Sequence, residues 1–388
     1  MKKRMLCALL ALLCLALGGC MSRQLEEQLL VIVLGVDEDE NHAVHLSVKV
    51  PSNASGGSGG SEESSDDNAS SGGGQMGYLL LEAKAETFAD ALALLDATTP
   101  RSLNFSQVRE VVLGESAGTC DKFSSIIHNV YALPRMRSQA VVVFCKGKAL
   151  EFVEAQKPYV GIRLSRYIET TLSSYAGKGF VPTTTLGEAF RDLGYGYQDP
   201  LLVCGAVNSF SYLQQPLSKN LEDAQAGTLS RKSVNPVELF GAAATDGVCV
   251  SGTLSGYEMA LMHLIQGKAQ SLSLQLEGDV PTHIYARRPA ALSVDLDSRP
   301  IRLRVEMTCQ GDYTPGFPPD RSALEERLRQ DVLAALEHMQ ALRCDGLGFG
   351  NLAARSFLTI DDWDAFSWRD AYQAAQIDVS LSLQLQVR

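Results

Sequence analysis

Strict alternation of apolar and polar residues near the C-terminal end constrains the fold of this chain more than any other sequence feature. Apolar side chains occupy every second position over residues 377–387, and again over 301–307. Successive side chains of a strand point to opposite faces, so each segment predicts a strand with one buried and one solvated face. Shorter alternating segments predict further strands at 272–276 and 292–296.

One long helix accompanies these strands. Apolar residues recur at helical spacing over residues 322–343, and Ser322 with Glu325 forms a candidate capping box at its start. Strands in runs beside a single long helix favour an α+β fold with antiparallel or mixed sheets and flanking helices, rather than a doubly wound parallel sheet.

The N-terminal half is also rich in strands, with more helices between them. A continuous apolar run at 29–36, a polar turn and alternation at 44–50 predict a hairpin. Thr87 and Asp90 resemble a helix cap. The remaining patterns predict strands at 78–83, 108–113, 140–145 and 201–207, and helices at 87–95, 149–156, 164–175 and 186–193.

A chain of 388 residues is long enough for two or three domains. The polar segment 214–236, which contains two prolines and a glycine, is the best candidate for an interdomain linker. It would separate an N-terminal α+β region at 20–213, of one or two subdomains, from a C-terminal α+β domain at 237–388. Residues 52–75 are rich in Ser and Gly without a large apolar residue, which predicts a flexible surface loop.

The first twenty residues have the parts of a lipoprotein signal. Lys2, Lys3 and Arg4 precede an apolar stretch at 6–17 that is too short to span a bilayer. The sequence then reads Leu-Gly-Gly-Cys, which resembles the bacterial lipobox and ends at Cys20. We therefore expect residues 1–19 to be removed and Cys20 to carry a lipid anchor at the outer face of the cell membrane. The alternative is an ordinary secretory signal that happens to end in cysteine.

The net charge of the chain limits which partners it can bind. The net charge of −11 argues against a nucleic-acid partner, because such proteins neutralise phosphates with a basic face.

No C-x-x-C motif occurs, and two cysteines directly follow buried-strand patterns. We predict that the cysteines remaining after processing are mostly free, buried thiols. They are Cys120, Cys145, Cys204, Cys249, Cys309 and Cys344.

The chain offers little catalytic or metal-binding chemistry. The pattern G-x-S-x-G around Ser116 follows a predicted strand, as a nucleophile elbow would, but no later histidine belongs to a recognisable motif. His42 and His45 are three positions apart in a predicted strand and would point to opposite faces, which suits a shared metal poorly. No Walker A motif is present. We therefore predict no catalytic residues, no metal and no cofactor.

The order of these motifs resembles the C subunits of spore germinant receptors, the Ger(x)C lipoprotein family. After the lipobox, the resemblance rests on a strand ending in Gly-x-Asp at Asp37 and on a Gly-Glu step at Gly114 after a strand. A Gly-x-Ala hairpin beginning at Gly241 follows. The most similar segment is the glycine-rich turn after the long helix, residues 344–350, which precedes Trp363 and Trp368.

The resemblance implies a three-domain α+β protein without enzymatic activity. It would assemble with two integral membrane partners, the A and B subunits, at the inner spore membrane, and would itself bind no small molecule directly. The alternatives are a solute-binding lipoprotein of an importer and, through Ser116, a lipid-anchored hydrolase.

The turn after the long helix is the candidate structural or interface site. Its residues are Asp345, Gly346, Gly348 and Gly350. The glycines permit positive φ and close backbone approach, and Asp345 is placed to accept backbone N–H hydrogen bonds where the chain reverses. The alternative role for Asp345 is direct contact with a partner.

Overall fold

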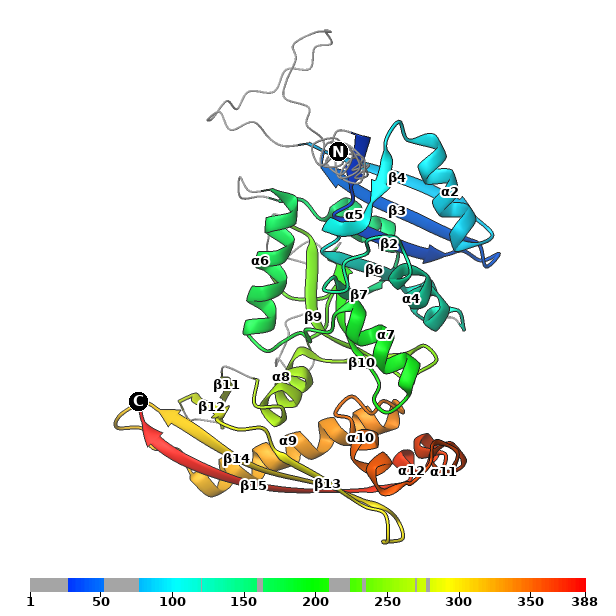
Figure 1. The fold of residues 1–388 in the computed structure, drawn as a ribbon. Coiled ribbons are helices and arrows are strands. Elements are labelled where there is room, and N and C mark those ends of the chain that lie inside the picture. The colour runs from blue at the N-terminus through cyan, green and yellow to red at the C-terminus, as the bar shows by residue number, and fades with distance from the viewer. Residues whose placement is uncertain are drawn as a thin grey trace, which may run out of the picture.

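The computed structural model describes residues 27–51, 77–119, 121–158, 163–208, 224–231, 235–268, 271–276 and 280–388. Cys20, the loop at 52–75, Cys120 and much of the segment 214–236 therefore lie outside the described residues. Figure 1 shows a large sheet with helices on both sides and, at its far end, a second sheet that carries the C-terminus.

The large sheet is mixed and has eight strands in the order β10-β9-β8-β7-β6-β2-β3-β4. Neighbours among β2, β6, β7 and β8 are parallel, whereas the strands at both edges pair antiparallel. Two short strands, β1 (Gln28–Leu30) and β5 (Ser102–Asn104), form a separate parallel pair. The eight strands are β2 (Val33–Glu38), β3 (Val44–Pro51), β4 (Tyr78–Ala85), β6 (Glu110–Gly114), β7 (Val141–Lys146), β8 (Leu201–Val207), β9 (Val237–Thr245) and β10 (Val250–Leu254).

Helices cover both faces of the parallel strands. Val111 and Leu113 of β6 join the core that α2, α4 and α7 cover, while Val112 between them joins the core under α5 and α6. A strand buried on both faces is apolar throughout, which explains the continuous apolar runs in the sequence. The helices of this region are α2 (Phe88–Thr98), η2 (Phe105–Gln107), α3 (Glu115–Gly118), α4 (Phe123–Tyr131), α5 (Ala149–Ala155), α6 (Leu164–Gly177) and α7 (Leu186–Tyr195).

The large sheet continues past the expected linker. Strand β8 precedes the segment 214–236 and β9 follows it, yet the two strands pair with each other, with Leu202 opposite Ala243. β9 and β10 form the predicted hairpin but complete the large sheet rather than the C-terminal one. A polar composition does not distinguish a linker between domains from a long excursion between neighbouring strands.

The C-terminal sheet is built around one long strand. Residues 302–306 of β14 pair with β13 and residues 309–312 pair with β12 along the same edge, while β15 pairs parallel along the whole other edge. The sheet is therefore mixed as well, and the predicted α+β class with mixed sheets and flanking helices is confirmed. Its strands are β11 (Leu272–Leu274), β12 (Thr282–Ala286), β13 (Ala291–Asp295), β14 (Arg302–Tyr313) and β15 (Gln376–Val387).

The predicted long helix is α9 (Arg321–Ala341), and it packs beside β15. Its N-cap is Asp320, which accepts hydrogen bonds from the backbone N–H groups of Ser322 and Ala323, so the helix starts before the expected Ser322 cap. Short helices follow: α10 (Phe349–Ala353), η5 (Ala354–Ser356), α11 (Ile360–Ala365) and α12 (Trp368–Gln373).

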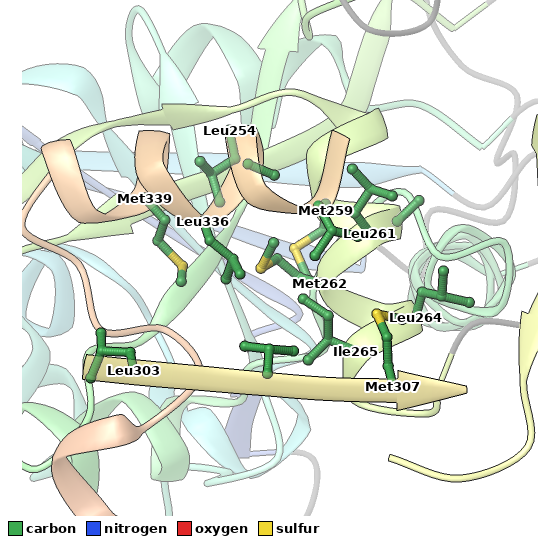
Figure 2. Close-up of a cluster of buried hydrophobic side chains, with 14 of the residues drawn as sticks. Leu254, Met259, Leu261, Met262, Leu264, Ile265, Leu303, Met307, Leu336 and Met339 are labelled. Carbon is green, nitrogen blue, oxygen red and sulfur yellow. The ribbon is translucent and has the colours of Figure 1, made fainter. Parts of the chain in front are cut away.

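An almost fully buried helix, α8 (Gly256–Ile265), joins the two sheets. Only Glu258 among its ten residues is not buried, as expected for a helix that is apolar all round. Figure 2 shows α8 side chains such as Met262 and Ile265 between α9 and β14. Ala242 and Ala244 of β9 belong to the same cluster, so the large sheet and the C-terminal sheet share one core.

The described cysteines are free thiols, as predicted. Cys145, Cys204, Cys309 and Cys344 are buried, and Cys249 is half-buried. Burial raises the pKa of Cys204 to about 11 and that of Cys309 to about 12, which keeps both thiols protonated and unreactive at neutral pH.

Candidate functional site

The glycine-rich turn begins where α9 ends. The backbone N–H of Cys344 reaches back to the carbonyl of Met339, and Arg343 adopts a left-handed conformation with φ of 57°. This arrangement resembles the Schellman motif, here with arginine in the position that glycine usually takes. Arg343 also forms an ion pair with Asp370 of α12 at 2.8 Å, which ties the end of α9 to that helix.

Asp345 organises the turn by accepting four hydrogen bonds. Its Oδ1 accepts the backbone N–H groups of Gly348 and Phe349 at 3.0 and 2.9 Å. Its Oδ2 accepts the N–H of Gly350 at 2.6 Å and the indole Nε1–H of Trp368 at 3.1 Å. The three backbone donors belong to the first turn of α10, which has no other side-chain cap at its start. Asp345 therefore holds α10 and α12 together.

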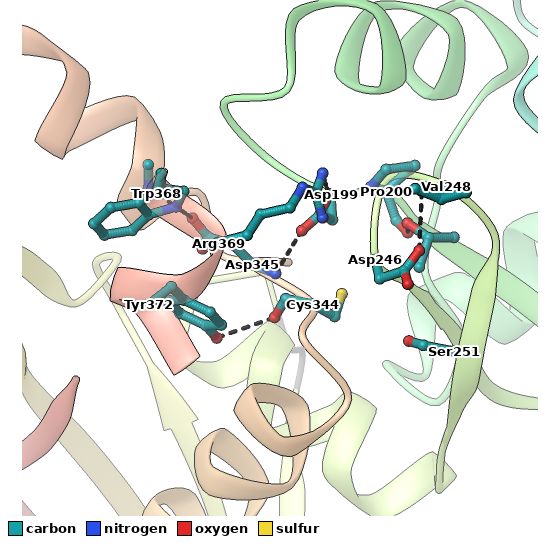
Figure 3. Close-up of polar contacts among 12 residues, drawn as sticks. Asp199, Pro200, Asp246, Val248, Ser251, Cys344, Asp345, Trp368, Arg369 and Tyr372 are labelled. Atoms are coloured by element: carbon teal, nitrogen blue, oxygen red, sulfur yellow. Dashed lines mark hydrogen bonds and ion pairs between the residues drawn. The ribbon is translucent and has the colours of Figure 1, made fainter. Parts of the chain in front are cut away.

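The turn is also connected to the large sheet through Asp199, which precedes β8. The backbone N–H of Asp345 donates to Oδ2 of Asp199 at 2.9 Å, and Arg369 of α12 donates to Oδ1 at 2.8 Å (Figure 3). Tyr372 donates its hydroxyl to the carbonyl of Cys344 at 3.0 Å. These contacts join Asp199, from the middle of the chain, to residues near its C-terminal end around one buried point.

Burial dominates the electrostatics of the two carboxyl groups. Asp345 is 3% exposed and Asp199 is 4% exposed. Desolvation raises the pKa of Asp345 to about 6, although the hydrogen bonds from Gly350, Phe349 and Trp368 oppose the shift. Desolvation also raises the pKa of Asp199, with Arg369 acting in the opposite direction. The carboxylate of Asp345 is therefore almost completely buried.

The glycines of the turn have different roles. Gly348 has φ of +77°, which side chains other than glycine rarely adopt. Gly350 has no such φ, but a Cβ atom there would lie 2.5 Å from the carbonyl oxygen of Tyr197. A Cβ atom at Gly346 would lie 2.9 Å from the Leu201 side chain. Glycine is therefore needed at 348 for its positive φ, and at 346 and 350 because neighbouring atoms approach the backbone closely.

An aromatic cluster packs beside the turn. Trp363 and Trp368 stack with ring centroids 5.9 Å apart, and Tyr372 lies 5.9 Å from Trp368. Tyr197, from the segment before β8, lies 5.6 Å from Trp363. The tryptophans that follow the turn in the sequence therefore form the apolar side of the same junction.

The other sequence candidates do not gather into a reactive site. Ser116 lies in the short helix α3, and its Oγ accepts a hydrogen bond from the Glu38 backbone N–H at 3.1 Å. It is not among the described residues with positive φ, unlike the strained serine of a nucleophile elbow. His42 precedes β3 in a turn and binds Glu38, whereas His45 lies in the strand and pairs with Glu82. The expected strand placement of His42 is therefore wrong.

Sequence reasoning missed two buried titratable side chains in the large sheet. Lys49 of β3 is 1% exposed and donates to the carbonyls of Val153 and Gln156 at 2.5 Å. Glu110 of β6 is fully buried and accepts from Nε2 of Gln156 at 2.7 Å. Burial lowers the pKa of Lys49 to about 8 and raises that of Glu110 to about 7. The alternating pattern at 44–50 predicts that Lys49 lies on the solvated face of its strand, but α5 covers that face of β3.

Within the described ranges, no helix has both the length and the apolar character needed to cross a bilayer. The same residues contain no group of three or more His, Cys, Asp or Glu side chains arranged to hold a metal ion.

Comparison with known proteins gives two family matches. The model described as "Spore germination protein N-terminal domain" matches residues 22–204, and "Spore germination B3/GerAC like, C-terminal" matches residues 241–387. No curated protein matches the chain. A solved structure described as "Crystal Structure of the GerBC protein" is 13% identical, with 91% of this chain and 96% of that chain covered and a TM-score of 0.47.

Proposed function

Because the chain belongs to the family of spore germinant receptor C subunits, we propose that it is the lipid-anchored, non-catalytic subunit of such a receptor. It would assemble with the integral membrane A and B subunits in nutrient-triggered germination. The observation that carries this proposal is the pair of family matches, which follow each other along residues 22–204 and 241–387.

The geometry of the glycine-rich turn supports a structural rather than a catalytic role for it. Asp345 accepts four hydrogen bonds and is almost fully buried, so its carboxylate is committed to the turn. We infer that the junction of Asp345 with Asp199 holds the two family regions in one arrangement. The surfaces that meet the membrane partners would then lie outside this junction.

Membrane attachment would come from Cys20, which lies outside the described residues. Acyl chains contribute roughly 0.8 kcal/mol per buried CH₂, so an anchor with more than one chain holds firmly. The proposed location is the outer face of the cell membrane, which corresponds to the inner membrane in spores.

Affinity purification of an epitope-tagged chain from spore membranes tests the proposal. We expect the A and B subunits to co-purify with the tagged chain, and Cys20→Ala to move the chain out of the detergent phase. Cys249→Ala, which removes a half-buried thiol, is the matched control and should stay in the detergent phase. Recovery of an importer ATPase and permease instead would support the solute-binding alternative. Unchanged partitioning of Cys20→Ala would contradict the anchor.

A further inference from the structure

A pocket of about 240 Å³ lies between α6 and the amino ends of β6 and β7. It is distinct from the Asp345 junction. Its polar lining comes from Arg109, Arg137, Gln139, Glu169, Ser173 and Thr183. Val141, Leu172, Ala176 and Pro182 complete the wall with apolar surface.

The charge of the lining is opposite to that of the chain. Two guanidinium groups and one carboxylate line the pocket, which leaves one positive charge in excess, while the whole chain carries −11. The ion pair between Arg109 Nη1 and Glu169 is long, at 3.7 Å, and Glu169 is shared with Arg166 at 3.8 Å. The lining therefore favours an anion.

The two arginines are incompletely satisfied within the protein. The Nε of Arg109 is buried and has no hydrogen-bond partner among the described residues. Arg137 forms no ion pair with any residue in the part of the chain that the structure describes. A guanidinium group presents its N–H donors in a planar fork that matches a carboxylate, and unmatched donors in a half-buried place are costly.

Backbone hydrogen bonds hold the walls of the pocket in place. The N–H of Val141 donates to the carbonyl of Arg109 at 3.0 Å, which fixes the two strand ends side by side. The N–H of Val142 donates to Thr184 at 3.3 Å, and the N–H of Gly187 donates to Ser138 at 2.9 Å. Arg109 is thus carried at the edge of the sheet, directly before β6, as a preformed binding site requires. Arg137 lies in the loop before β7, where its carbonyl accepts the N–H of Ala140 at 3.0 Å.

We propose that this pocket binds a small organic carboxylate. The carboxylate lies between Arg109 and Arg137, and an apolar tail packs against Leu172, Ala176 and Pro182. Glu169 already neutralises part of the charge of Arg109, so Arg137 supplies most of the attraction. The proposal does not depend on the receptor function above, and it differs from the expectation that the chain binds no small molecule.

Calorimetric titration of the purified full-length chain with sodium 3-methylbutanoate tests the proposal. We expect saturable binding of one molecule per chain. The neutral isostere 3-methylbutanamide should bind at least about 10-fold more weakly, because it lacks the charge that the arginines recognise. Equal affinity for the two compounds, or no saturable binding of the carboxylate, would overturn the proposal. Binding of inorganic phosphate alone would also overturn it, since the pocket would then select phosphate.

Three variants locate the binding. Arg137→Gln should weaken binding of the carboxylate by about 10- to 100-fold. Ala176→Leu should abolish it by filling the apolar end of the pocket. Arg135→Gln is the matched control, because Arg135 is exposed in the same loop but does not line the pocket, and its affinity should stay unchanged. Thermal unfolding verifies that each variant is folded. A folded Arg137→Gln variant with unchanged affinity would refute the assignment of the site.

Discussion

Asp199 and Asp345, 146 positions apart in the chain, hydrogen-bond to each other in both directions. The backbone N–H of Asp199 donates to the Asp345 carbonyl at 3.2 Å, and the backbone N–H of Asp345 donates to the Asp199 carboxylate at 2.9 Å. This reciprocal pair joins the start of β8 to the turn after α9. The stability of the turn and that of the large sheet are therefore expected to depend on each other.

Removing the Asp345 carboxylate should destabilise the protein strongly. Asp345→Ala leaves three backbone N–H groups and the Trp368 indole N–H without their acceptor in a buried place. We expect a loss of at least about 3 kcal/mol in the free energy of unfolding, measured by urea denaturation. Asp370→Ala is the control, because that side chain is 75% exposed, and its effect should stay within about 0.5 kcal/mol. Similar losses in the two variants would contradict the capping role of Asp345.

Gly348→Val should be costly for two separate reasons. The φ of +77° disfavours a β-branched residue, and a Cβ atom would lie 2.8 Å from Asn351 Nδ2 and Gln198 Oε1. Gly316 has a similar φ of +87°, but a Cβ atom there meets nothing within 4 Å. Gly316→Val therefore measures the backbone strain alone, about 1–2 kcal/mol. We expect Gly348→Val to lower the free energy of unfolding by about 3 kcal/mol or more, and equal losses would show that the close contacts relax without cost.

Local signals in the sequence predicted the elements well. Thr87 caps its helix as expected, with Asp90 three positions later. Ser255 caps α8 in the same way, with Glu258 three positions later. The alternating segments became strands because each has one face on a core. Strand β12 was not predicted, and the apolar run at 29–36 divides into β1 and β2.

Long-range pairing is what the sequence could not supply. The parallel pairing of β14 with β15 and the return of β9 to β8 depend on partners far away in the chain. The same difference between local and long-range contacts holds for the candidate site. Asp345 could be found because its three backbone donors are three to five residues away. Its partner Asp199 could not, because no local pattern connects the two residues.

The loop at 52–75 is predicted to be dispensable for folding. Pro51 and Tyr78 are paired opposite each other in the β3–β4 hairpin, so a short turn can connect them. Replacing residues 52–77 with Asn-Gly, the preferred two-residue hairpin turn, shortens the loop without opening the sheet. Because each halving of a loop lowers the entropic cost of closing it by only about 0.6 kcal/mol, the shorter loop should raise the free energy of unfolding by no more than about 2 kcal/mol. A loss above about 2 kcal/mol in thermal or urea unfolding would show that the segment packs on the protein.

The raised pKa of Glu110 should make the free energy of unfolding fall as the pH rises. Its pKa is raised from 4.5 to about 7 in the folded protein, so between these values the folded state binds a proton that the unfolded state has lost. The stabilisation from this group is complete below pH 4.5 and is lost above pH 7, a change of roughly 3 kcal/mol. Asp345 acts in the same direction, with a pKa raised from 3.8 to about 6.

Glu110→Gln isolates the contribution of this carboxyl group. The variant cannot ionise, so its free energy of unfolding relative to wild type should increase by roughly 2–3 kcal/mol between pH 5 and pH 8. The Asp345 contribution remains in both proteins and cancels in the comparison. Urea unfolding at several pH values measures the difference. Parallel pH profiles would mean that Glu110 keeps the same protonation state when the protein folds.

The ion pair between Arg369 and Asp199 should couple the C-terminal helices to the large sheet. Arg369→Ala leaves the carboxyl group of Asp199, which is 4% exposed, without its cationic partner, so we expect a loss of about 2–4 kcal/mol. Asp199→Asn keeps an oxygen that can accept the Asp345 N–H but removes the charge. If the pair acts directly, the double variant should lose less than the sum of the two single variants, with a coupling energy of about 1 kcal/mol or more by urea unfolding. Additive losses would place the contribution of Arg369 elsewhere in the junction. Both tryptophans lie beside the turn, so tryptophan fluorescence reports on the C-terminal helices. If Arg369→Ala loses its fluorescence signal before its far-UV signal, these helices unfold in a separate first step. That result would show that the contact makes the two regions unfold as one unit.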